Sequence, residues 1–157
     1  MSKSALAAPR LNIVLDRPRI AGNIGAIVRL AAATGCALHV CGETPFDVDD
    51  KRMRRAGLDY WSLAEVHFHR TTERCLSFLG RDPWIVEVGG KKAPWDVALL
   101  PGDVVVLGPE DGSVEIAQMP PERFLTLPLE AGARSLNVAQ CTAVVAFEAV
   151  KQQSSVR

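Results

Sequence analysis

A short segment near the carboxyl end carries polar side chains among small residues, a combination that suits a binding site. Its polar residues are Glu130, Arg134, Ser135 and Asn137. The small residues 131–133 between them let backbone approach a ligand closely. Residues 138–153 follow, apolar on most faces, so this helix is expected to be buried all round, with Asn137 as its N-cap. The same pattern is also typical of an ordinary loop before a core helix.

Three loops rich in Gly or Ala follow predicted strands, at residues 89–90, 108–112 and 131–137. Ligands of open α/β sheets bind at the carboxyl ends of the strands. These loops, far apart in the chain, are therefore expected to converge over one edge of a sheet. A fourth small-residue segment, residues 21–25, follows the first strand.

Several common chemistries lack their residues in this chain. Gly22 and Gly25 have no third glycine after them, and no acid closes the second strand, which argues against dinucleotide binding. No Walker-type Lys precedes a Ser or Thr. No Ser lies in a nucleophile elbow that would support Ser-His-Asp catalysis.

The thiols and imidazoles do not have the spacing of a metal site. Cys36, Cys41, Cys75 and Cys141 form no CxxC pair and have no His at ligand spacing. They are expected to be buried, reduced thiols. The residues 67–69 place two histidines on either side of Phe68 in one strand, which favours an ordinary two-faced strand over a metal pair. No metal is expected.

The alternation of short apolar runs and helical segments predicts an open, mostly parallel α/β sheet with helices on both faces. Residues 11–15, a helix capped by Asn23 and ending at Thr34, and residues 37–41 form a βαβ unit. Further elements are expected as strands at 65–68, 84–88, 103–107 and 124–127, and as helices at 49–55, 71–79, a short one ending at 119, and 138–153.

Length and composition limit the class of protein. A chain of 157 residues with 48% hydrophobic residues is long enough for one domain with a real core, here residues 11–157. Residues 1–10 are expected to be a disordered tail, too short and too weakly apolar for a signal peptide. No apolar run could span a membrane. Zero net charge argues against coating of nucleic acid by bulk charge but allows a local basic patch. The expected compartment is the cytoplasm.

Four blocks of sequence, in this order, carry a family resemblance. They are residues 23–29 (NIGAIVR), 51–60 (KRMRRAGLDY), 107–110 (LGPE), and 127–129 (LPL) with 134–137 (RSLN). Together they resemble the SPOUT superfamily of RNA methyltransferases, and most closely its small tRNA wobble-nucleotide 2'-O-methyltransferases. The resemblance extends from Leu11 to about Gln152.

The resemblance implies a C-terminal trefoil knot, in contrast to the usual rule that chains do not thread loops. It also implies S-adenosylmethionine bound in the knot, and a homodimer formed through the first and last helices. A homodimer would account for the apolar character of residues 138–150. The partners implied are tRNA and a second copy of the chain, with no membrane and no metal.

The same resemblance implies roles for individual residues. The catalytic residues would be Arg29, Ser135 and Asn137. The cofactor would be held mostly by backbone, at Val88, Gly108, Glu110, Leu127, Leu129, Ser135 and Leu136. Arg29 matches a motif arginine near the target 2'-hydroxyl. Because a guanidinium is nearly always protonated, we expect it to bind the adjacent phosphate and stabilise the developing alkoxide rather than act as a base. Position alone favours an ordinary surface arginine.

RNA contacts are expected from the basic residues, of which the cluster at 51–55 is the strongest candidate. The full set is Arg17, Arg19, Asn23, Lys51, Arg52, Arg54, Arg55 and Arg134, with Lys91 and Lys92 as an extension. The alternative is that the cluster is a solvated helix face with Asp49 and Asp50 as partners.

The chain departs from the family pattern at three places. Ala26 and Ala139 stand where Asn and Ser are frequent, and the loop at 108–112 is one residue shorter than usual. The expected activity is 2'-O-methylation of a tRNA anticodon-loop nucleotide, the wobble cytidine or uridine. The alternatives are ribosomal RNA methylation, a knotted RNA-binding protein without catalysis, and an unknotted flavodoxin-like nucleotide binder.

Overall fold

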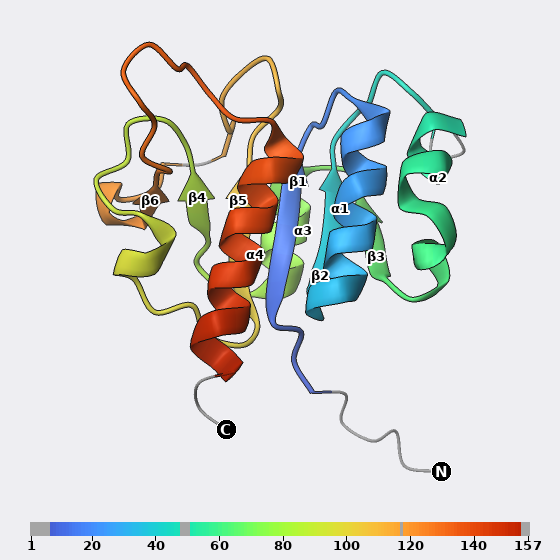
Figure 1. Cartoon of the computed structure of the whole chain (residues 1–157), viewed down its shortest axis with the longest axis horizontal. Coiled ribbons are helices and arrows are strands. Elements are labelled where there is room, and N and C mark those ends of the chain that lie inside the picture. The colour runs from blue at the N-terminus through green and yellow to red at the C-terminus, as the bar shows by residue number, and fades with distance from the viewer. Residues whose placement is uncertain (1–6, 48–50, 117, 155–157) are drawn as a thin grey trace.

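The computed structural model describes residues 7–47, 51–116 and 118–154. Its centre is a six-stranded parallel sheet in the order β3-β2-β1-β5-β4-β6 (Figure 1). The strands are β1 (Leu11–Asp16), β2 (Ala37–Cys41), β3 (Glu65–His69), β4 (Trp84–Val86), β5 (Asp103–Leu107) and β6 (Phe124–Leu125). Strands β1, β2 and β5 are almost wholly buried, which fits their near-continuous apolar sequences.

Helices cover both faces of the sheet, as predicted. The helices α1 (Ala21–Thr34) and α4 (Val138–Ser154) pack together on one face, and α2 (Lys51–Gly57) packs against α1 (Figure 1). The helix α3 (Thr72–Leu79) lies on the other face, where Cys75 packs with Val14, Val104 and other buried residues. Short 3-10 turns, η1 (Leu58–Ser62), η2 (Pro94–Asp96) and η3 (Pro121–Arg123), complete the elements.

Most predicted elements are confirmed, and the βαβ unit is parallel as expected because β1 pairs with β2 in parallel register. The predicted helix ending at 119 is wrong. In its place the N–H of Val114 donates to Glu87 Oε1 at 2.6 Å, and the N–H of Glu115 donates to Asp16 Oδ2 at 3.1 Å. Amides used in this way cannot bond to carbonyls of a preceding helical turn. Asp49 and Asp50 of the predicted helix 49–55 lie outside the described residues.

The amino-terminal tail is shorter than predicted. The N–H of Gly102 donates to the carbonyl of Pro9 at 2.7 Å, and the N–H of Arg10 donates to that of Gly35 at 2.9 Å. The guanidinium of Arg10 also donates to the carbonyl of Thr34 at 2.8 Å. Pro9 and Arg10 therefore belong to the folded part of the chain, while residues 1–6 lie outside the described residues.

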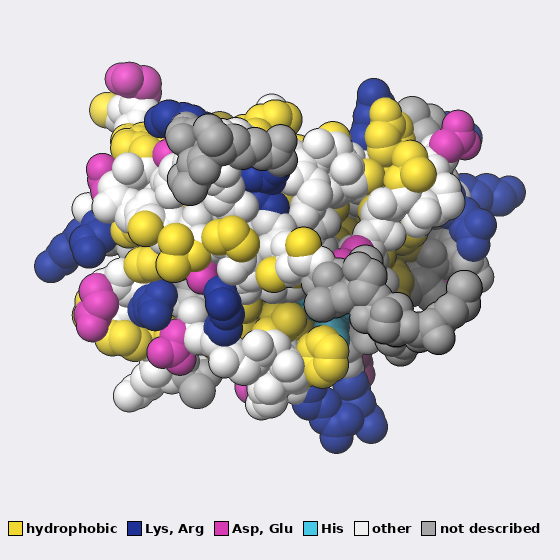
Figure 2. Space-filling model, turned by 90° about the horizontal axis from the view of Figure 1, so that it is seen from below, with side chains coloured by type: hydrophobic (Ala, Val, Ile, Leu, Met, Phe, Trp, Pro, Cys, Tyr) yellow, Lys and Arg dark blue, Asp and Glu magenta, His cyan; other side chains and the backbone are white. Residues whose placement is uncertain are grey.

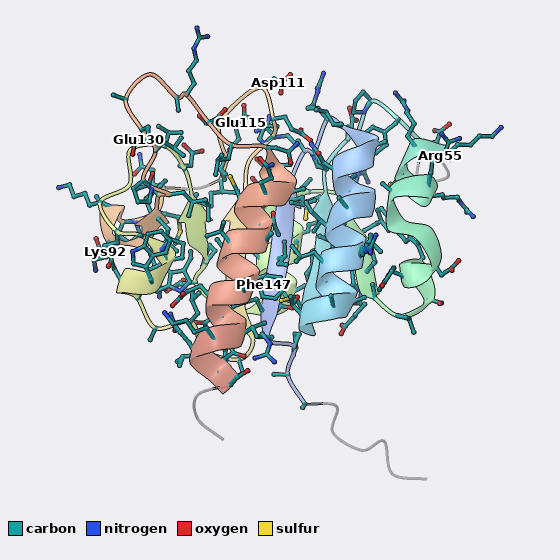
Figure 3. All side chains as sticks on the ribbon, viewed as in Figure 1. Arg55, Lys92, Asp111, Glu115, Glu130 and Phe147 are labelled. Carbon is teal, nitrogen blue, oxygen red and sulfur yellow. The ribbon has the colours of Figure 1, made fainter. Side chains whose placement is uncertain are left out.

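The helix α4 is not buried all round within one chain. Its inner side, including Val145, Ala146 and Ala149, is buried, but Phe147 is 55% exposed and Val144 is 38% exposed. The side chain of Phe147 lies on the outer face of α4 (Figure 3). No helix within the described ranges has the length and apolarity to cross a membrane.

Candidate functional site

A cavity of about 470 Å³ lies at the carboxyl ends of β4, β5 and β6. Its volume is in the range of small-molecule sites. The walls combine apolar side chains with glycines and polar groups from three loops and the start of α4. It is lined by Ile20, Asn23, Val86, Glu87, Val88, Leu107, Gly108, Pro109, Glu110, Gly112, Ser113, Thr126, Leu127, Leu129, Ser135, Leu136, Asn137, Val138 and Cys141.

The structure thus brings together every residue expected to hold the cofactor. The three predicted loops converge because parallel strands place their carboxyl ends at one edge of the sheet. Asn137 and Ser135, two of the three expected catalytic residues, also line the cavity. Asn137 has the predicted capping role, since its Oδ1 accepts the N–H groups of Ala139 and Gln140 at 2.8 and 3.3 Å.

Asn23 does not cap α1, which begins at Ala21 with Ile20 before it. Its Nδ2 donates to Glu110 Oε1 at 3.0 Å, and its Oδ1 accepts from Asn137 Nδ2 at 3.0 Å. The amide therefore joins the loop after β5 to the start of α4. This use of both amide groups makes Asn23 a support for the cavity wall rather than a free RNA contact.

Glu110 lies at the N-terminus of α1, although it is almost ninety residues further along the chain. Its carboxylate accepts the N–H groups of Arg19 and Ile20 at 2.7 and 3.2 Å, in addition to the Asn23 amide. A carboxylate at a helix N-terminus also interacts favourably with the helix dipole. The one-residue-shorter loop is therefore tied to α1, and both Glu110 and Gly112 reach the cavity.

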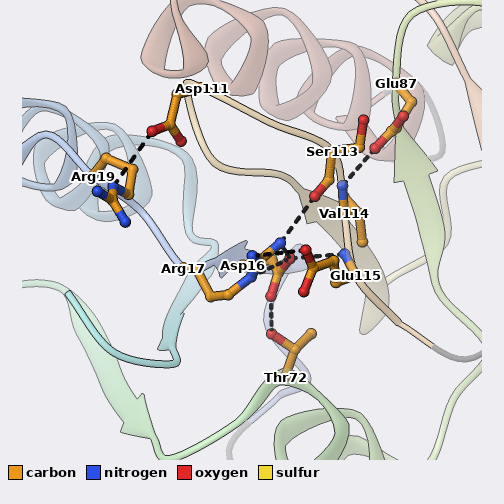
Figure 4. Close-up of polar contacts among 9 residues, drawn as sticks. All are labelled: Asp16, Arg17, Arg19, Thr72, Glu87, Asp111, Ser113, Val114 and Glu115. Carbon is orange, nitrogen blue, oxygen red and sulfur yellow. Dashed lines mark hydrogen bonds and ion pairs between the residues drawn. The ribbon is translucent and has the colours of Figure 1, made fainter.

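The remainder of this loop is fixed by a second polar network, drawn in Figure 4. Arg17 donates to the carbonyl of Ser113 at 2.9 Å and pairs with Asp16 and Glu115 at 3.0 and 3.2 Å. The hydrogen bond with Asp16 raises the pKa of the Arg17 guanidinium above its usual value. Arg17 has a positive φ of 49°, an uncommon conformation that these contacts stabilise. From sequence, Arg17 was expected to bind RNA, and its role in holding this loop was missed.

The Glu110→Ala variant is expected to lose about 1–2 kcal/mol of stability, because the N–H groups of Arg19 and Ile20, just before α1, lose their carboxylate. It should also weaken binding of an adenosyl ligand by roughly tenfold, since Asn23, which accepts from Asn137, loses its anchor. Thermal unfolding and calorimetry with S-adenosylhomocysteine measure the two effects.

The matched control is Asp111→Ala on the same loop. Asp111 is exposed, and its ion pair with Arg19 is a weak surface contact at 3.7 Å. Its loss should therefore change neither the stability nor the ligand affinity measurably. Equal effects of the two substitutions would contradict the anchoring role of Glu110.

Arg29 does not line the cavity. It lies on the exposed side of α1, with its guanidinium carbon 5.2 Å from the centroid of the Tyr60 ring. It is six residues beyond Asn23, about 9 Å further along the helix axis. Within one chain, therefore, the third expected catalytic residue is separate from the other two.

The expected RNA-binding residues occupy two regions. Lys51, Arg52, Arg54 and Arg55 are exposed on α2, and Arg55 extends outward from the molecule (Figure 3). Arg19 and Arg134 are exposed near the cavity. At the opposite end of the molecule, Lys and Arg side chains are spread among acidic ones (Figure 2).

Two carboxylates, Glu87 and Glu110, line the cavity. Asp111, Glu115 and Glu130 lie at the same end of the molecule (Figure 3), where Asp111 pairs with Arg19 and Glu115 with Arg17. The two carboxylates of the wall favour a cationic ligand over a phosphate. Sequence reasoning did not identify Glu87 as a wall residue, nor Cys141. Cys141 could have been found, because it lies one helical turn after Asn137.

An open parallel α/β sheet with a small-residue cavity at its carboxyl edge, next to an exposed basic helix, fits the resemblance to the SPOUT methyltransferases. The sequence matches the SpoU rRNA Methylase family over residues 10–147. The chain therefore belongs to this family, and the predicted resemblance is confirmed.

Individual relatives agree with the family assignment. The chain is 39% identical over 148 residues to a tRNA (cytidine(34)-2'-O)-methyltransferase of a Polaromonas species, with 90% of each chain covered. It is 34% identical over 151 residues to the enzyme of that name from Yersinia pestis, covering 90% of this chain and 93% of the relative.

Solved structures have the same fold. One, from work on the 2-OH methylation of C/U34 on tRNA, is 30% identical, has a TM-score of 0.81, and covers 92% of this chain and 97% of its own. The SpoU methyltransferase AviRb from Streptomyces viridochromogenes in complex with AdoMet has a TM-score of 0.80 at 23% identity, covering 96% of this chain and 63% of its own. The latter likeness concerns the fold alone.

Proposed function

We propose that this protein transfers the methyl group of S-adenosylmethionine to the ribose 2'-oxygen of the wobble cytidine or uridine of tRNA. One observation carries the proposal. In a chain of the SpoU family, the seven residues expected to hold the cofactor line a single cavity. The names of the relatives give the nucleotide and the class of RNA.

The residues of the cavity fit the cofactor. Leu107, Leu127 and Leu129 offer an apolar wall for the adenine. A Cβ on Gly108 would lie 3.0 Å from the Val114 nitrogen, so the two sides of this loop pack too closely for a side chain at residue 108. Glu87 and Glu110 provide the negative charge that a sulfonium requires. The bound cofactor supplies an electrophilic methyl group on a positively charged sulfur.

This chain's own part in the reaction is to bind, to align and to stabilise charge. The Asn23–Asn137 pair holds the start of α4 against the loop after β5, next to the place where the ribose must enter. Arg29 binds the phosphate beside the target nucleotide and stabilises the developing 2'-alkoxide. Since Arg29 lies on the outer side of α1, it serves the cavity of a second copy of the chain.

The proposal includes a homodimer through α1 and α4. The exposed apolar side chains Val144 and Phe147 on α4 support it, because a monomer gains nothing from exposing them on the helix that packs against α1. We also propose that the end of the chain is threaded as a trefoil knot. Its support is that the chain leaves edge strand β6 and returns to place α4 beside α1 and β1. Tracing the path of residues 108–154 in an experimental electron-density map tests the threading.

The Phe147→Glu variant is expected to be monomeric, because a carboxylate would be buried without a partner in the dimer interface. It should also lose most tRNA methylation. Sedimentation measures the first effect and methyl transfer the second. The matched control is Leu63→Glu, which alters a 73% exposed apolar residue outside α1 and α4 and should leave a dimer. A Phe147→Glu dimer would contradict the proposed interface.

The basic face of α2 is the proposed site for the tRNA backbone. Replacing both Arg54 and Arg55 with Gln should weaken tRNA binding at low salt and lower the slope of log affinity against log salt by about one for each lost phosphate contact. Filter binding over a range of salt concentrations measures this slope. An unchanged slope would place the RNA elsewhere.

The decisive assay uses cofactor labelled in its methyl group, total tRNA and ribosomal RNA, followed by nucleoside mapping. The proposal expects label in the 2'-O-methylated nucleoside at the wobble position and none in ribosomal RNA. Label only in ribosomal RNA would transfer the activity to that substrate. Binding of S-adenosylhomocysteine without transfer would support a knotted RNA-binding protein.

The free, mostly buried cysteines support a cytoplasmic location for the reaction.

A further inference from the structure

A cluster of imidazoles and thiols lies on the α3 face of the sheet, away from the proposed methylation site. His39 and Cys41 come from β2, His69 from β3 and Cys75 from α3. We call these four residues the His–Cys cluster. One ring nitrogen of His39, one of His69 and the sulfur of Cys75 lie within 4.8 Å of one another. Cys41 and Cys75 are both fully buried and pack in one cluster of core residues.

The register of the sheet creates this arrangement. Cys41 pairs directly with His69 across β2 and β3, and His39 pairs with His67. Side chains two residues apart on a strand share a face, so all of these side chains point toward α3, where Cys75 completes the group. Phe68 occupies the other face. His67 and His69 therefore share one face and lie opposite Phe68, as the sequence predicted, and His69 is the one close to Cys75.

Neighbouring groups fix the orientation of His39. The amide nitrogen of Asn12 donates to the carbonyl of Gly102 at 2.9 Å, which leaves its Oδ1 to accept from His39 Nε2 at 3.1 Å. His39 therefore carries its proton on Nε2. Its Nδ1 points into the cluster, where it accepts a hydrogen bond from His69 Nε2 at 2.9 Å. A second-shell oxygen that fixes the tautomer in this way is typical of histidine ligands of metals.

We propose that the His–Cys cluster binds a Zn²⁺-type transition metal ion, with His39, His69 and Cys75 as ligands and Cys41 as the fourth. Two imidazoles and two thiolates form a common structural zinc donor set. Tetrahedral coordination at normal bond lengths places donor atoms about 3.3–3.8 Å apart. His39, His69 and Cys75 therefore need only small side-chain movements, and the Cys41 thiol must turn toward them.

The proton balance of the cluster allows a metal ion. With its proton on Nε2, His39 offers Nδ1 to the ion, and His69 offers Nε2 once its own proton has moved to Nδ1. The thiol protons of Cys41 and Cys75 are released on binding, because the thiolates are the ligands.

Such an ion would tie β2, β3 and α3 together. His39 is only 1% exposed and both cysteines are fully buried, so only His69 connects the site to the surface. One turn before Cys75, Thr72 donates to Asp16, the carboxylate that holds Arg17 and the cavity loop. The metal would therefore act structurally, by fixing the side of the sheet that supports this network.

The test uses the reduced full-length chain without a histidine tag, treated with a chelator and then titrated with Co²⁺. Co²⁺ bound to thiolates at a tetrahedral site gives a thiolate-to-metal charge-transfer band and strong d–d absorption. We expect both bands to saturate at one equivalent and to disappear when Zn²⁺ is added. Zn²⁺ should also raise the thermal unfolding midpoint by about 5 °C or more.

Matched variants separate a built site from general metal binding. His69→Gln and Cys75→Ser should each weaken Co²⁺ binding at least tenfold and abolish the Zn²⁺-dependent rise in midpoint. His67 lies two residues before His69 on β3 and pairs with Glu65 at 2.9 Å. His67→Gln should retain both the Co²⁺ affinity and the Zn²⁺-dependent rise in midpoint. Cys36→Ser is the thiol control, because Cys36 packs in the core with Leu38 and Val105, apart from the His–Cys cluster. Cys41→Ser should keep the metal but lose about half of the charge-transfer intensity.

The proposal is overturned if the native chain shows no charge-transfer band. It is equally overturned if His69→Gln and Cys75→Ser bind Co²⁺ as His67→Gln does. Full charge-transfer intensity in Cys41→Ser would overturn Cys41 as the fourth ligand. Because His69 is only half-buried and Ser is close in size to Cys, these variants should fold, and circular dichroism before metal addition verifies it.

Discussion

The Arg29→Ala variant is expected to lower kcat for tRNA methylation by about 10²–10³, the usual cost of removing one group that stabilises a developing oxyanion. Affinity for S-adenosylhomocysteine should not change, because Arg29 lines no part of the cavity. Stability should fall by no more than about 1 kcal/mol, the contribution of the guanidinium over the Tyr60 ring. Single-turnover methyl transfer, calorimetry and thermal unfolding measure the three quantities.

The control for Arg29 is an arginine at the other end of the sheet. Arg81 is exposed and donates to Asp103 at the start of β5, so Arg81→Ala should leave kcat unchanged. Arg29→Lys should recover only part of the activity, because an ammonium cannot make the paired hydrogen bonds of a guanidinium. If Arg29→Ala turned over normally, Arg29 would be an ordinary surface residue that packs on Tyr60.

Mixed dimers can decide which cavity Arg29 serves. In a dimer of one Arg29→Ala subunit and one Asn137→Ala subunit, each chain lacks one functional group. If Arg29 acts in the second copy, one cavity combines an intact Asn137 with the other subunit's intact Arg29, and activity returns. If Arg29 acts in its own chain, both cavities are incomplete and the mixed dimer is inactive. Co-expression with two different tags yields the mixed species.

The convergence of the cavity loops could be predicted from sequence because it depends on local signals and one topological rule. Residues 37–41 and 103–107 are short apolar runs bounded by turn residues, and they form strands at those positions. Parallel strands then require that the loops after them meet at one edge. The structure was needed only to identify the residues that hold these loops together.

Contacts between residues far apart in sequence could not be predicted. Asn23 has the sequence features of an N-cap, but Glu110, 87 residues later, takes its amide, and Asn137, 114 residues later, donates to its carbonyl. Likewise His39 and His69 are 30 residues apart and meet only through the β2–β3 register. A search for closely spaced ligands cannot detect a site assembled by register, which is why no metal was expected.

Gly25→Ala is expected to lower the free energy of unfolding by about 3 kcal/mol, which corresponds to roughly 10 °C in the unfolding midpoint. A Cβ on Gly25 would collide with the carbonyl oxygen of Met53, and it would lie 2.6 Å from the Cβ of Ala56 and 2.8 Å from the nitrogen of Gly57. Two of these three groups belong to the backbone of α2, which cannot turn away as a flexible side chain can. The helices must therefore move apart.

The matched control is Gly22→Ala, one turn earlier on the same helix. Nothing lies within 4 Å of a Cβ at Gly22, so alanine there should be neutral or raise stability by up to about 1 kcal/mol through its higher helix propensity. Thermal and urea unfolding of the two variants, compared at equal protein concentration, gives the difference. Similar midpoints for both would mean that α2 does not pack on α1 through Gly25.

Gly25→Ala also tests the link between this packing and RNA. The helix α2 carries Arg54 and Arg55, and its position relative to the cavity is set mainly by its contact with α1. Displacement of α2 should weaken tRNA binding in the folded variant while S-adenosylhomocysteine binding is retained, because no α2 residue lines the cavity. Loss of both together at a temperature where the variant is folded would instead place the α1–α2 contact within the cofactor site.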